Sequence, residues 1–455
     1  MSEQQCDVVV VGLGPGGEAL AARLAKAGLT VVAVEAELVG GECPYWGCIP
    51  SKMFIRAANA LAEARRIDGL AGHAEVTPDL APVAKRIREE ATDDWDDTVA
   101  ADRLAEAGIR LVRGHGRLAG DRTVEVETAD GVERLVATRG VVLNTGTTPA
   151  VPPIEGLAET PFWTNRDALK AIDAPESLVV IGGGAIGLEL AQAFSRFGTD
   201  VAVLEVAPRI LGPEEPESSE LIADVLMAEG IGIHAGITID GVVHDGARFH
   251  VTCGDQTLEA EQVLVSAGRT SRIADVGLDT VGVDASGRFL EVDDDQQVTD
   301  GLWAIGDIVG RGAFTHVAMY QSERAARSIL GEPQEPYDTS LPRVTFTDPE
   351  VGAVGLTEQQ ARERGIAVDV ATSSVASSAR GWIHGIGNEG LIKLVIDTDR
   401  DVLVGATSVG PTGGETLAGL AVAVRAEVPV ATLRNSIYAY PTYWRAVEST
   451  FPKPA

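Results

Sequence analysis

The sequence predicts an α/β fold in which two parallel-sheet domains are followed by an α+β domain. Three observations lead to this prediction. One strand–turn–helix–strand pattern occurs twice, at residues 6–35 and 178–205. The stretch from 343 to 455 mixes strand and helix signals without a third copy of the pattern. The chain of 455 residues is also about the length of three ordinary domains.

The first copy opens with an apolar run at 8–11, which predicts a buried strand. Gly12, Gly14 and Gly17 follow, then a helical stretch and a second apolar run that ends at Glu35. In such a turn the first glycine permits the bend, the second lets a pyrophosphate approach, and the third lets the helix pack on the strand. Glu35 stands where a carboxylate accepts a hydrogen bond from a ribose 2′-hydroxyl.

The second copy repeats these features at Gly182, Gly184, Gly187 and Glu205. A single glycine motif is weak evidence, but two copies in complete context indicate two dinucleotides, most simply FAD and a nicotinamide cofactor. The carboxylate of Glu205 favours NAD(H) over NADP(H), because it would repel a 2′-phosphate. Arg209 is the nearest basic residue.

Two further short strands end in small residues where a backbone could turn beneath a nucleotide. The run 140–143 precedes Thr145 and Gly146, and the run 263–265 precedes Gly268. We expect these three residues to bind cofactor.

The remaining chain gives three weaker signals. Asp307 directly follows an apolar strand, which places an acid at a strand end. Residues 80–108 read as one long charged helix followed by a strand. Proline-rich stretches at 149–153 and 331–342 are typical of domain boundaries.

The chemical centre is predicted at a close cysteine pair, Cys43 and Cys48, in a Gly/Pro-rich segment. A helical run follows at 53–67, so Cys48 would lie near a helix start, where the dipole stabilises a thiolate. Such a pair can close a disulfide that takes up and releases two electrons. A bound metal is disfavoured, because no second Cys/His pair lies nearby at zinc spacing.

The charge and hydropathy of the chain argue against nucleic acids and membranes as binding partners. The net charge of −30 repels nucleic acid and anionic membranes, so neither is expected as a partner. No apolar run reaches the roughly 20 residues of a membrane span, and no signal peptide is seen, so we expect a cytoplasmic protein.

These motifs closely resemble the class I pyridine nucleotide-disulfide oxidoreductases, which include dihydrolipoamide dehydrogenase, glutathione reductase and mercuric reductase. The resemblance runs nearly end to end and includes the segment around the cysteines and residues 346–350. It implies two Rossmann-like domains and a homodimer. The expected ranges are an FAD-binding domain at 1–150 and 270–335, an NAD(P)-binding domain at 151–269, and a dimerisation domain at 341–455.

The resemblance also implies roles for single residues. Cys48 would be the thiol next to the flavin, and Cys43 the thiol that exchanges with substrate. Lys52 would lie beside the flavin ring, paired with Glu189, and Asp307 would hold the ribityl chain. Two more residues join the expected cofactor contacts, Gly41 and Gly116.

The chain departs from the family at Tyr440, where glutathione- and lipoamide-type enzymes have a histidine that handles protons in the partner's active site. Arg445 stands where the orienting glutamate would be, and Glu448 follows one turn later. A tyrosine is a poor base at pH 7. The alternative is that Tyr440 and its aromatic neighbours only pack, and His316 and His384 remain possible proton donors.

The sequence therefore predicts an FAD-dependent enzyme that passes electrons from NADH through Cys43 and Cys48 to an unusual acceptor, with Tyr440 among the catalytic residues. The acceptor could be a small-molecule disulfide, a quinone or a metal ion. One alternative is direct transfer from flavin to a quinone or metal ion. Another is a flavoprotein subunit of a complex that carries lipoyl groups.

Overall fold

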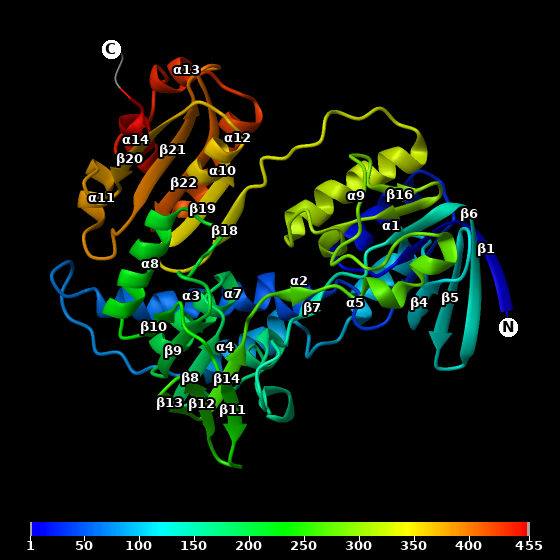
Figure 1. Ribbon diagram of the computed structural model, residues 1–455, viewed down its shortest axis with the longest axis horizontal. Coiled ribbons are helices and arrows are strands. Elements are labelled where there is room, and N and C mark those ends of the chain that lie inside the picture. The colour runs from blue at the N-terminus through cyan, green and yellow to red at the C-terminus, as the bar shows by residue number, and fades with distance from the viewer. Residues whose placement is uncertain (1, 453–455) are drawn as a thin grey trace. The chain divides into compact units, whose positions relative to one another are not determined.

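The computed structural model describes residues 2–452, which divide into two compact units (Figure 1). Within the described residues, the first comprises 2–51, 85–150 and 269–337, and the second 52–84, 151–268 and 338–452. The boundary between Ser51 and Lys52 falls inside helix α3 (Cys48–Arg65). The three-domain division of the sequence stays a prediction.

The first unit is built on an eight-stranded sheet. Its main path runs β16-β17-β6-β1-β2-β3, parallel except for β16, and β5 joins β6 and β4 in an antiparallel ribbon. The strands are β1 (Ser2–Val11), β2 (Val31–Glu35), β3 (Arg110–Arg113), β4 (His115–Leu118), β5 (Thr123–Thr128), β6 (Gly131–Leu143), β16 (Gln297–Thr299) and β17 (Leu302–Ala304). A short pair, β7 (Thr148–Pro149) and β15 (Arg269–Thr270), lies apart from this sheet.

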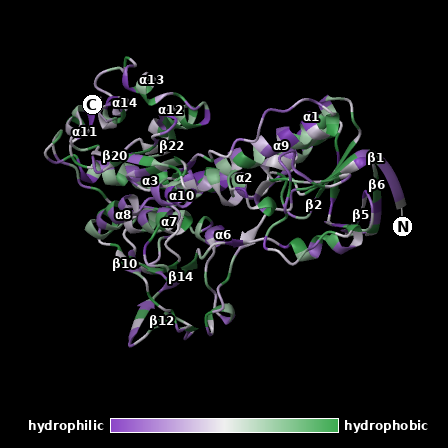
Figure 2. Cartoon of the chain, turned by 45° about the horizontal axis from the view of Figure 1, so that its top comes forward, coloured by the Kyte–Doolittle hydropathy of each residue, from purple (hydrophilic) through white to green (hydrophobic). Residues whose placement is uncertain are grey.

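Strand β1 is apolar on both faces because both faces are covered. Val8 and Val10 pack with helices α1 (Pro15–Lys26), α5 (Thr98–Glu106) and α9 (Thr315–Leu330). Val9 and Val11 pack with the β4–β5 ribbon on the opposite face. All five residues of β2 are buried, and the hydrophobic colour gathers on the strands around it (Figure 2). This is the continuous burial expected of a parallel strand.

The prediction of one long helix over 80–108 is wrong. The segment forms α4 (Ala81–Arg86), a π-helical turn (Ile87–Ala91) and α5, which begins at Thr98. Residues 93–95 between them take left-handed backbone conformations, with φ of 48°, 57° and 59°. The break lets the Trp95 ring stack on Trp46, with centroids 5.5 Å apart, and lets its indole N–H donate to the Tyr45 carbonyl. Tertiary packing against the cysteine segment therefore overrides the local helical pattern.

The second unit contains a parallel sheet in the order β10-β9-β8-β14 and an antiparallel sheet in the order β11-β12-β13. Their strands are β8 (Ser177–Ile181), β9 (Asp200–Glu205), β10 (Gly232–Ala235), β11 (Gly241–His244), β12 (Phe249–Cys253), β13 (Gln256–Ala260) and β14 (Gln262–Val265). The helices of this part are α6 (Asn165–Ala168), α7 (Ala185–Arg196) and α8 (Pro216–Ala228).

The C-terminal part of the second unit is an antiparallel sheet in the order β18-β19-β22-β21-β20, accompanied by helices. Its strands are β18 (Arg343–Thr345), β19 (Glu350–Gly355), β20 (Val368–Ser374), β21 (Leu391–Asp397) and β22 (Val402–Gly410). Its helices are α10 (Glu358–Glu363), α11 (Ala379–His384), α12 (Gly413–Arg425), α13 (Val430–Arg434) and α14 (Tyr443–Thr450).

Parallel sheets that carry helices, followed by an α+β segment, confirm the predicted fold class. None of the helices within residues 2–452 combines the length and the apolar character needed to cross a bilayer.

Candidate functional site

The first glycine turn links β1 to α1, and its glycines are not equivalent. Gly12 has φ +92°, and a Cβ there would lie 2.3 Å from the carbonyl oxygen of Asn144. A Cβ on Gly17 would lie 2.2 Å from the carbonyl oxygen of Gly12. A Cβ on Gly14 would meet only an ordinary contact, at 3.4 Å. Folding therefore requires Gly12 and Gly17, but it does not require Gly14.

The second turn, between β8 and α7, repeats this division. A Cβ on Gly182 would lie 2.6 Å from the Ser266 carbonyl oxygen, and one on Gly187 would lie 2.2 Å from the Gly182 carbonyl oxygen. No atom lies within 4 Å of a Cβ on Gly184. Gly184 is also the N-cap of α7 and has no side chain to bond the first-turn N–H groups. An open backbone at a helix N-terminus fits the approach of a pyrophosphate.

The two acids expected at the ribose positions also hold the glycine turns. Glu35 accepts hydrogen bonds from the N–H groups of Leu13 (2.7 Å) and Glu37 (2.8 Å). Glu205 accepts from Gly183 and Ala207, both at 2.7 Å. Burial raises the pKa of the Glu35 carboxyl, while the two backbone N–H groups lower it. Each carboxylate keeps lone pairs that could accept from a ribose hydroxyl.

Two residues that begin the predicted turns after the neighbouring strands close the glycine turns. The Asn144 side-chain amide, after β6, donates to the Gly12 carbonyl at 3.1 Å. The Ser266 hydroxyl, after β14, donates to the Gly182 carbonyl at 3.0 Å. The two parallel sheets therefore stabilise their glycine turns in the same way with different side chains.

The other predicted cofactor residues fall into two groups. Gly41 and Gly116 pack tightly: a Cβ on Gly41 would lie 2.8 Å from the Cα of Gly14, and one on Gly116 would lie 3.0 Å from a Val34 methyl group. The second group faces open space. It consists of Gly146 and Gly268, which have left-handed φ and no atom within 4 Å of a Cβ, and the exposed Thr145.

Asp307 lies in a 3₁₀ turn after β17, in the first unit. Its carboxylate accepts a hydrogen bond from the Thr147 hydroxyl at 2.9 Å, and Arg269 lies 3.9 Å away. Arg269 also donates to the Thr147 hydroxyl and carbonyl oxygens, each at 2.7 Å. Burial raises the pKa of Asp307, against the smaller lowering effects of Thr147 and Arg269. The Asp307 carboxyl group is therefore fixed in place by Thr147, and its burial disfavours the ionised form.

The two cysteines lie on consecutive short elements of the first unit. Cys43 is in helix α2 (Glu42–Trp46), and Cys48 is the first residue of α3, as the sequence predicts. Both side chains are thiols, and both are partly exposed. The hydrogen bond between the two thiols raises the pKa of Cys43, and burial raises it further. The neutral thiol of Cys43 is therefore favoured over its thiolate.

A third residue joins the cysteines, and the sequence did not reveal it. The hydroxyl oxygen of Thr315 lies 3.3 Å from the Cys48 sulfur, and it also hydrogen-bonds to Cys43, whose pKa it lowers. Thr315 is the first residue of the 16-residue helix α9. The positive end of that helix therefore faces the thiols and opposes the rise in the Cys43 pKa.

Lys52 lies one turn beyond Cys48 on α3 and forms the predicted ion pair with Glu189 of α7, within the second unit. The Lys52 ammonium nitrogen is 2.7 Å from a Glu189 carboxylate oxygen. The carboxylate is buried, with 6% of its side chain exposed, whereas 36% of the lysine is exposed. The buried Glu189 carboxylate therefore holds the Lys52 ammonium group in place, while part of the lysine side chain stays accessible to solvent.

Tyr440 differs from the aromatic residues around it. Tyr438 stacks on Trp444, donates to the Leu433 carbonyl and is partly buried, so these neighbours pack. Tyr440 is 72% exposed. Arg445 pairs with Glu448 at 2.9 Å.

The remaining histidine candidates lie on helix ends. His316 follows Thr315 on α9, and its ring is stacked on that of Phe314. His384 ends α11 in the second unit. Among residues 2–452, no group of three His, Cys, Asp or Glu side chains could hold a metal ion.

Comparison with known proteins agrees with this arrangement. The family model "Pyridine nucleotide-disulphide oxidoreductase" matches residues 6–322, and the model of its dimerisation domain matches 341–450, which supports a homodimer. A dihydrolipoyl dehydrogenase of Chlorobaculum tepidum is 34% identical over 96% of this chain and 94% of its own length. A mercuric reductase of Shewanella putrefaciens is 32% identical over 97% of this chain and 80% of its own length.

A solved structure shares the whole architecture. The Cu(II) complex of the HOCl-induced flavoprotein disulfide reductase RclA from Escherichia coli is 26% identical, with a TM-score of 0.87 over 98% of this chain and 99% of that one. The chain therefore belongs to the pyridine nucleotide-disulphide oxidoreductase family and is an FAD- and NAD(P)-dependent flavoprotein disulfide oxidoreductase of the lipoamide dehydrogenase/mercuric reductase type.

Proposed function

We propose that this protein oxidises NADH and passes two electrons through Cys43 and Cys48 to an acceptor that is reduced without a histidine acid–base. The observation that carries the proposal is the contact of the two thiols with each other and with the Thr315 hydroxyl at a helix N-terminus. The Thr315 hydroxyl and the helix N-terminus oppose the rise in the Cys43 pKa that the thiol–thiol contact and burial cause, and the thiolate is the reactive form in thiol exchange.

FAD would be held in the first unit. The turn from Gly12 to Gly17 would receive its pyrophosphate, Glu35 its ribose, and Asp307 its ribityl chain. When bound, FAD supplies the two-electron transfer between nicotinamide and disulfide that side chains cannot carry out alone.

The cysteine pair stores the electrons. Its S–S bond takes up two electrons and two protons and becomes two thiols. With a disulfide acceptor, Cys43 sulfur bonds to one acceptor sulfur and releases the other as a thiol. Cys48 sulfur then attacks Cys43 sulfur, which re-forms the original disulfide and releases the second thiol. Each released thiolate needs a proton.

The exposed phenol at Tyr440 supports an acceptor whose reduction needs no added proton, because a tyrosine is a poorer proton shuttle than a histidine at neutral pH. Two Cu(II) ions, for example, each take one electron, and the dithiol returns to the disulfide with loss of two protons. Among a small disulfide, a quinone and a metal ion, we therefore favour the metal ion as substrate. The mercuric reductase relatives and the Cu(II) complex of RclA are consistent with this choice.

The test is anaerobic reduction of Cu(II) by the FAD-loaded enzyme and NADH, followed with a Cu(I)-specific chelator. We expect Cys43→Ser and Cys48→Ser each to lose the activity. Full activity in both variants would instead indicate direct transfer from the flavin. A quinone tested in parallel separates the two routes, because direct transfer to quinone would survive both substitutions.

Two observations favour NADH over NADPH: the carboxylate of Glu205 and the hydrogen bonds that already occupy the Arg209 guanidinium group. The Arg209 guanidinium donates to the carbonyl oxygens of Leu211, Gly212 and Glu214 at 2.7–3.0 Å. It is therefore bound to the protein backbone and would have to break these bonds to reach a 2′-phosphate. A lower KM for NADPH than for NADH would contradict this assignment.

The exposure of Tyr440 also supports its placement in a second subunit's site. Ile437, three residues earlier, is fully exposed, so this stretch offers an apolar and aromatic surface. The family's dimerisation-domain model covers it. We expect Tyr440 to contribute to the site of the partner subunit.

A further inference from the structure

One carboxylate in the second unit has two partners. The Oε2 atom of Glu189 lies 2.7 Å from the Lys52 ammonium nitrogen, and the Oε1 atom accepts the backbone N–H of Phe346 at 2.8 Å. The Lys52 nitrogen also lies 4.6 Å from the centroid of the Phe346 ring. Phe346 therefore contacts the ion pair twice, through its backbone and through its ring face, which attracts a cation.

Side chains further along α7 hold the chain just after Phe346. Gln192 accepts the Asp348 N–H at 2.8 Å and donates to the Asp348 carbonyl at 2.9 Å. Arg196 donates to the Asp348 carboxylate at 2.8 Å. Glu189, Gln192 and Arg196 recur at helical spacing and share one face of α7. This face fixes the segment between β18 and β19 through both its backbone and its carboxylate.

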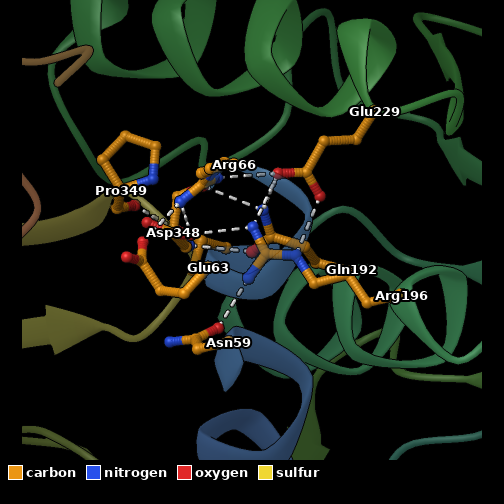
Figure 3. Close-up of polar contacts among 9 residues, drawn as sticks. Asn59, Glu63, Arg66, Gln192, Arg196, Glu229, Asp348 and Pro349 are labelled. Atoms are coloured by element: carbon orange, nitrogen blue, oxygen red, sulfur yellow. Dashed lines mark hydrogen bonds and ion pairs between the residues drawn. The ribbon is translucent and has the colours of Figure 1, made fainter. Parts of the chain in front are cut away.

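A cluster of four charges, which we call the arginine cluster, closes around Asp348 (Figure 3). It consists of Arg66, Arg196, Glu229 and Asp348. Arg66 and Arg196 both bond the same Asp348 oxygen at 2.8 Å, and Arg196 also bonds both oxygens of Glu229, at 2.6 and 3.0 Å. Only 4% of the Arg196 side chain is exposed. The more exposed Glu63 also pairs with Arg66, at 3.3 Å. Removing the charge of Asp348 would therefore take away the carboxylate that the two arginines share and leave an excess of positive charge in the cluster.

Residues of α3, and Arg66 directly after it, contact the same side chains of α7 and Asp348. Lys52 pairs with Glu189, Asn59 accepts from Arg196 at 2.6 Å, and Arg66 pairs with Asp348. Lys52 and Asn59 lie in α3, and Arg66 directly follows its last residue. The three are seven residues apart and lie on one side of the helical path. Contacts that served only to hold α3 against α7 would not need the Glu189 carboxylate that binds Lys52. The Lys52–Glu189 ion pair therefore forms one end of the network that ends at Asp348.

We propose that Asp348 and Phe346 are positioning residues for Lys52: the arginine cluster fixes Asp348, Asp348 fixes Phe346, and Phe346 with Glu189 fixes the ammonium group. Both residues lie within the range matched by the dimerisation-domain model. That part of the chain therefore takes part in setting a side chain of the redox machinery. The proposal rests on the proposed function in one respect, that Lys52 acts beside the flavin.

Three variants of the full chain test it. Asp348→Asn keeps both backbone hydrogen bonds to Gln192 and removes the charge between the two arginines. Phe346→Leu keeps the backbone N–H and every ion pair, and removes only the ring over Lys52. Glu358→Gln is the control, because it removes one carboxylate from a different buried cluster around Lys393 and touches none of these residues.

The first readout is the acylation rate of the Lys52 amine, measured by peptide mapping of folded protein with and without FAD. We expect it to rise several-fold in Asp348→Asn and Phe346→Leu and to stay at the wild-type rate in Glu358→Gln. Unchanged acylation in both test variants would overturn the proposal. If Asp348→Asn does not fold, Phe346→Leu decides alone.

The second readout is the rate of flavin reduction by NADH in a stopped-flow instrument. Small misplacements of a positioned group cost up to about a hundredfold in rate, and we expect about a tenfold loss. Faster acylation with an unchanged reduction rate would support the positioning but remove Lys52 from the redox step. The two readouts thus separate a failure of this inference from a failure of the proposed function.

Discussion

The hydroxyl oxygen of Thr315 lies 3.3 Å from the sulfur of Cys48, at the first residue of α9. The two cysteines come from the segment that precedes and opens α3, and Thr315 comes from a helix more than 260 residues later in the chain. The hydroxyl and the helix dipole act on the thiols together. A residue outside the cysteine motif therefore lowers a pKa that the Cys48 contact and burial raise.

Thr315→Val tests this relationship. The Cys48 hydrogen bond and burial raise the pKa of Cys43, and the Thr315 hydroxyl lowers it, so removal of the hydroxyl should raise the pKa further. A hydrogen bond to a charged group is worth about 1.5 kcal/mol or more, which corresponds to about tenfold less thiolate at a fixed pH. The alkylation rate of Cys43 in the reduced pair with iodoacetamide, measured at fixed pH values between 6 and 10, should fall about tenfold. Thr315→Ser should retain the wild-type profile, and identical profiles for Val and wild type would refute the role.

The glycines of the second turn separate folding from ligand binding. Gly187→Ala should destabilise the protein by a few kcal/mol or shift the backbone, because its Cβ would lie 2.2 Å from the Gly182 carbonyl oxygen. Gly184→Ala should leave the melting temperature nearly unchanged, since no atom lies within 4 Å and its backbone is extended. It should still weaken NADH binding, because the methyl group would occupy the space that a pyrophosphate needs. Calorimetry and a binding titration on each variant check both effects, and equal NADH affinity for Gly184→Ala and wild type would argue against a nucleotide there.

The raised pKa of Asp307 predicts how the stability of the FAD-free protein depends on pH. Burial raises its pKa, so the folded protein binds this proton more tightly than the unfolded chain does. The stability contributed by the protonated form is fully present below the unfolded pKa of about 3.9 and is lost as the pH rises through the folded pKa. Asp307→Asn should therefore raise the melting temperature of FAD-free protein at pH 7, by an amount that shrinks toward pH 4. The same variant should bind FAD more weakly, and a lower melting temperature at pH 7 would contradict the sign.

Tyr440→His tests the acceptor assignment. An imidazole titrates near neutrality and can protonate a leaving thiolate. We expect the variant to gain activity with lipoamide or glutathione disulfide, by about ten- to a hundredfold if general acid catalysis is restored. Cu(II) reduction should change little, which provides the internal control. No gain with any disulfide would mean that the tyrosine does not limit that chemistry.

The sequence predicted those features that depend on local chemistry. Gly12 and Gly182 could be identified because a tight strand–helix turn demands glycine, and Cys48 at a helix start followed from the order of residues around it. The Lys52–Glu189 pair was expected only through family resemblance, since 137 residues separate the two side chains.

Other features depend on distant contacts and left no local signal. Trp95 breaks the predicted helix because it stacks on Trp46, and nothing in the 80–108 pattern reveals that partner. Thr315 occupies an ordinary-looking position in the sequence, and Asp348 was noticed only as part of the 346–350 stretch that resembles the family. Their importance follows only from the side chains that the fold brings to them.

The measurement that tests the central claim most directly is a count of reactive thiols. The FAD-loaded protein, oxidised in air and then reduced anaerobically with NADH, is alkylated and mapped by mass spectrometry. The proposed route predicts that Cys43 and Cys48 are joined before reduction and that both become alkylated after NADH is added, while Cys6 and Cys253 do not change. A flavin that is reduced by NADH while the Cys43–Cys48 disulfide remains closed would contradict it.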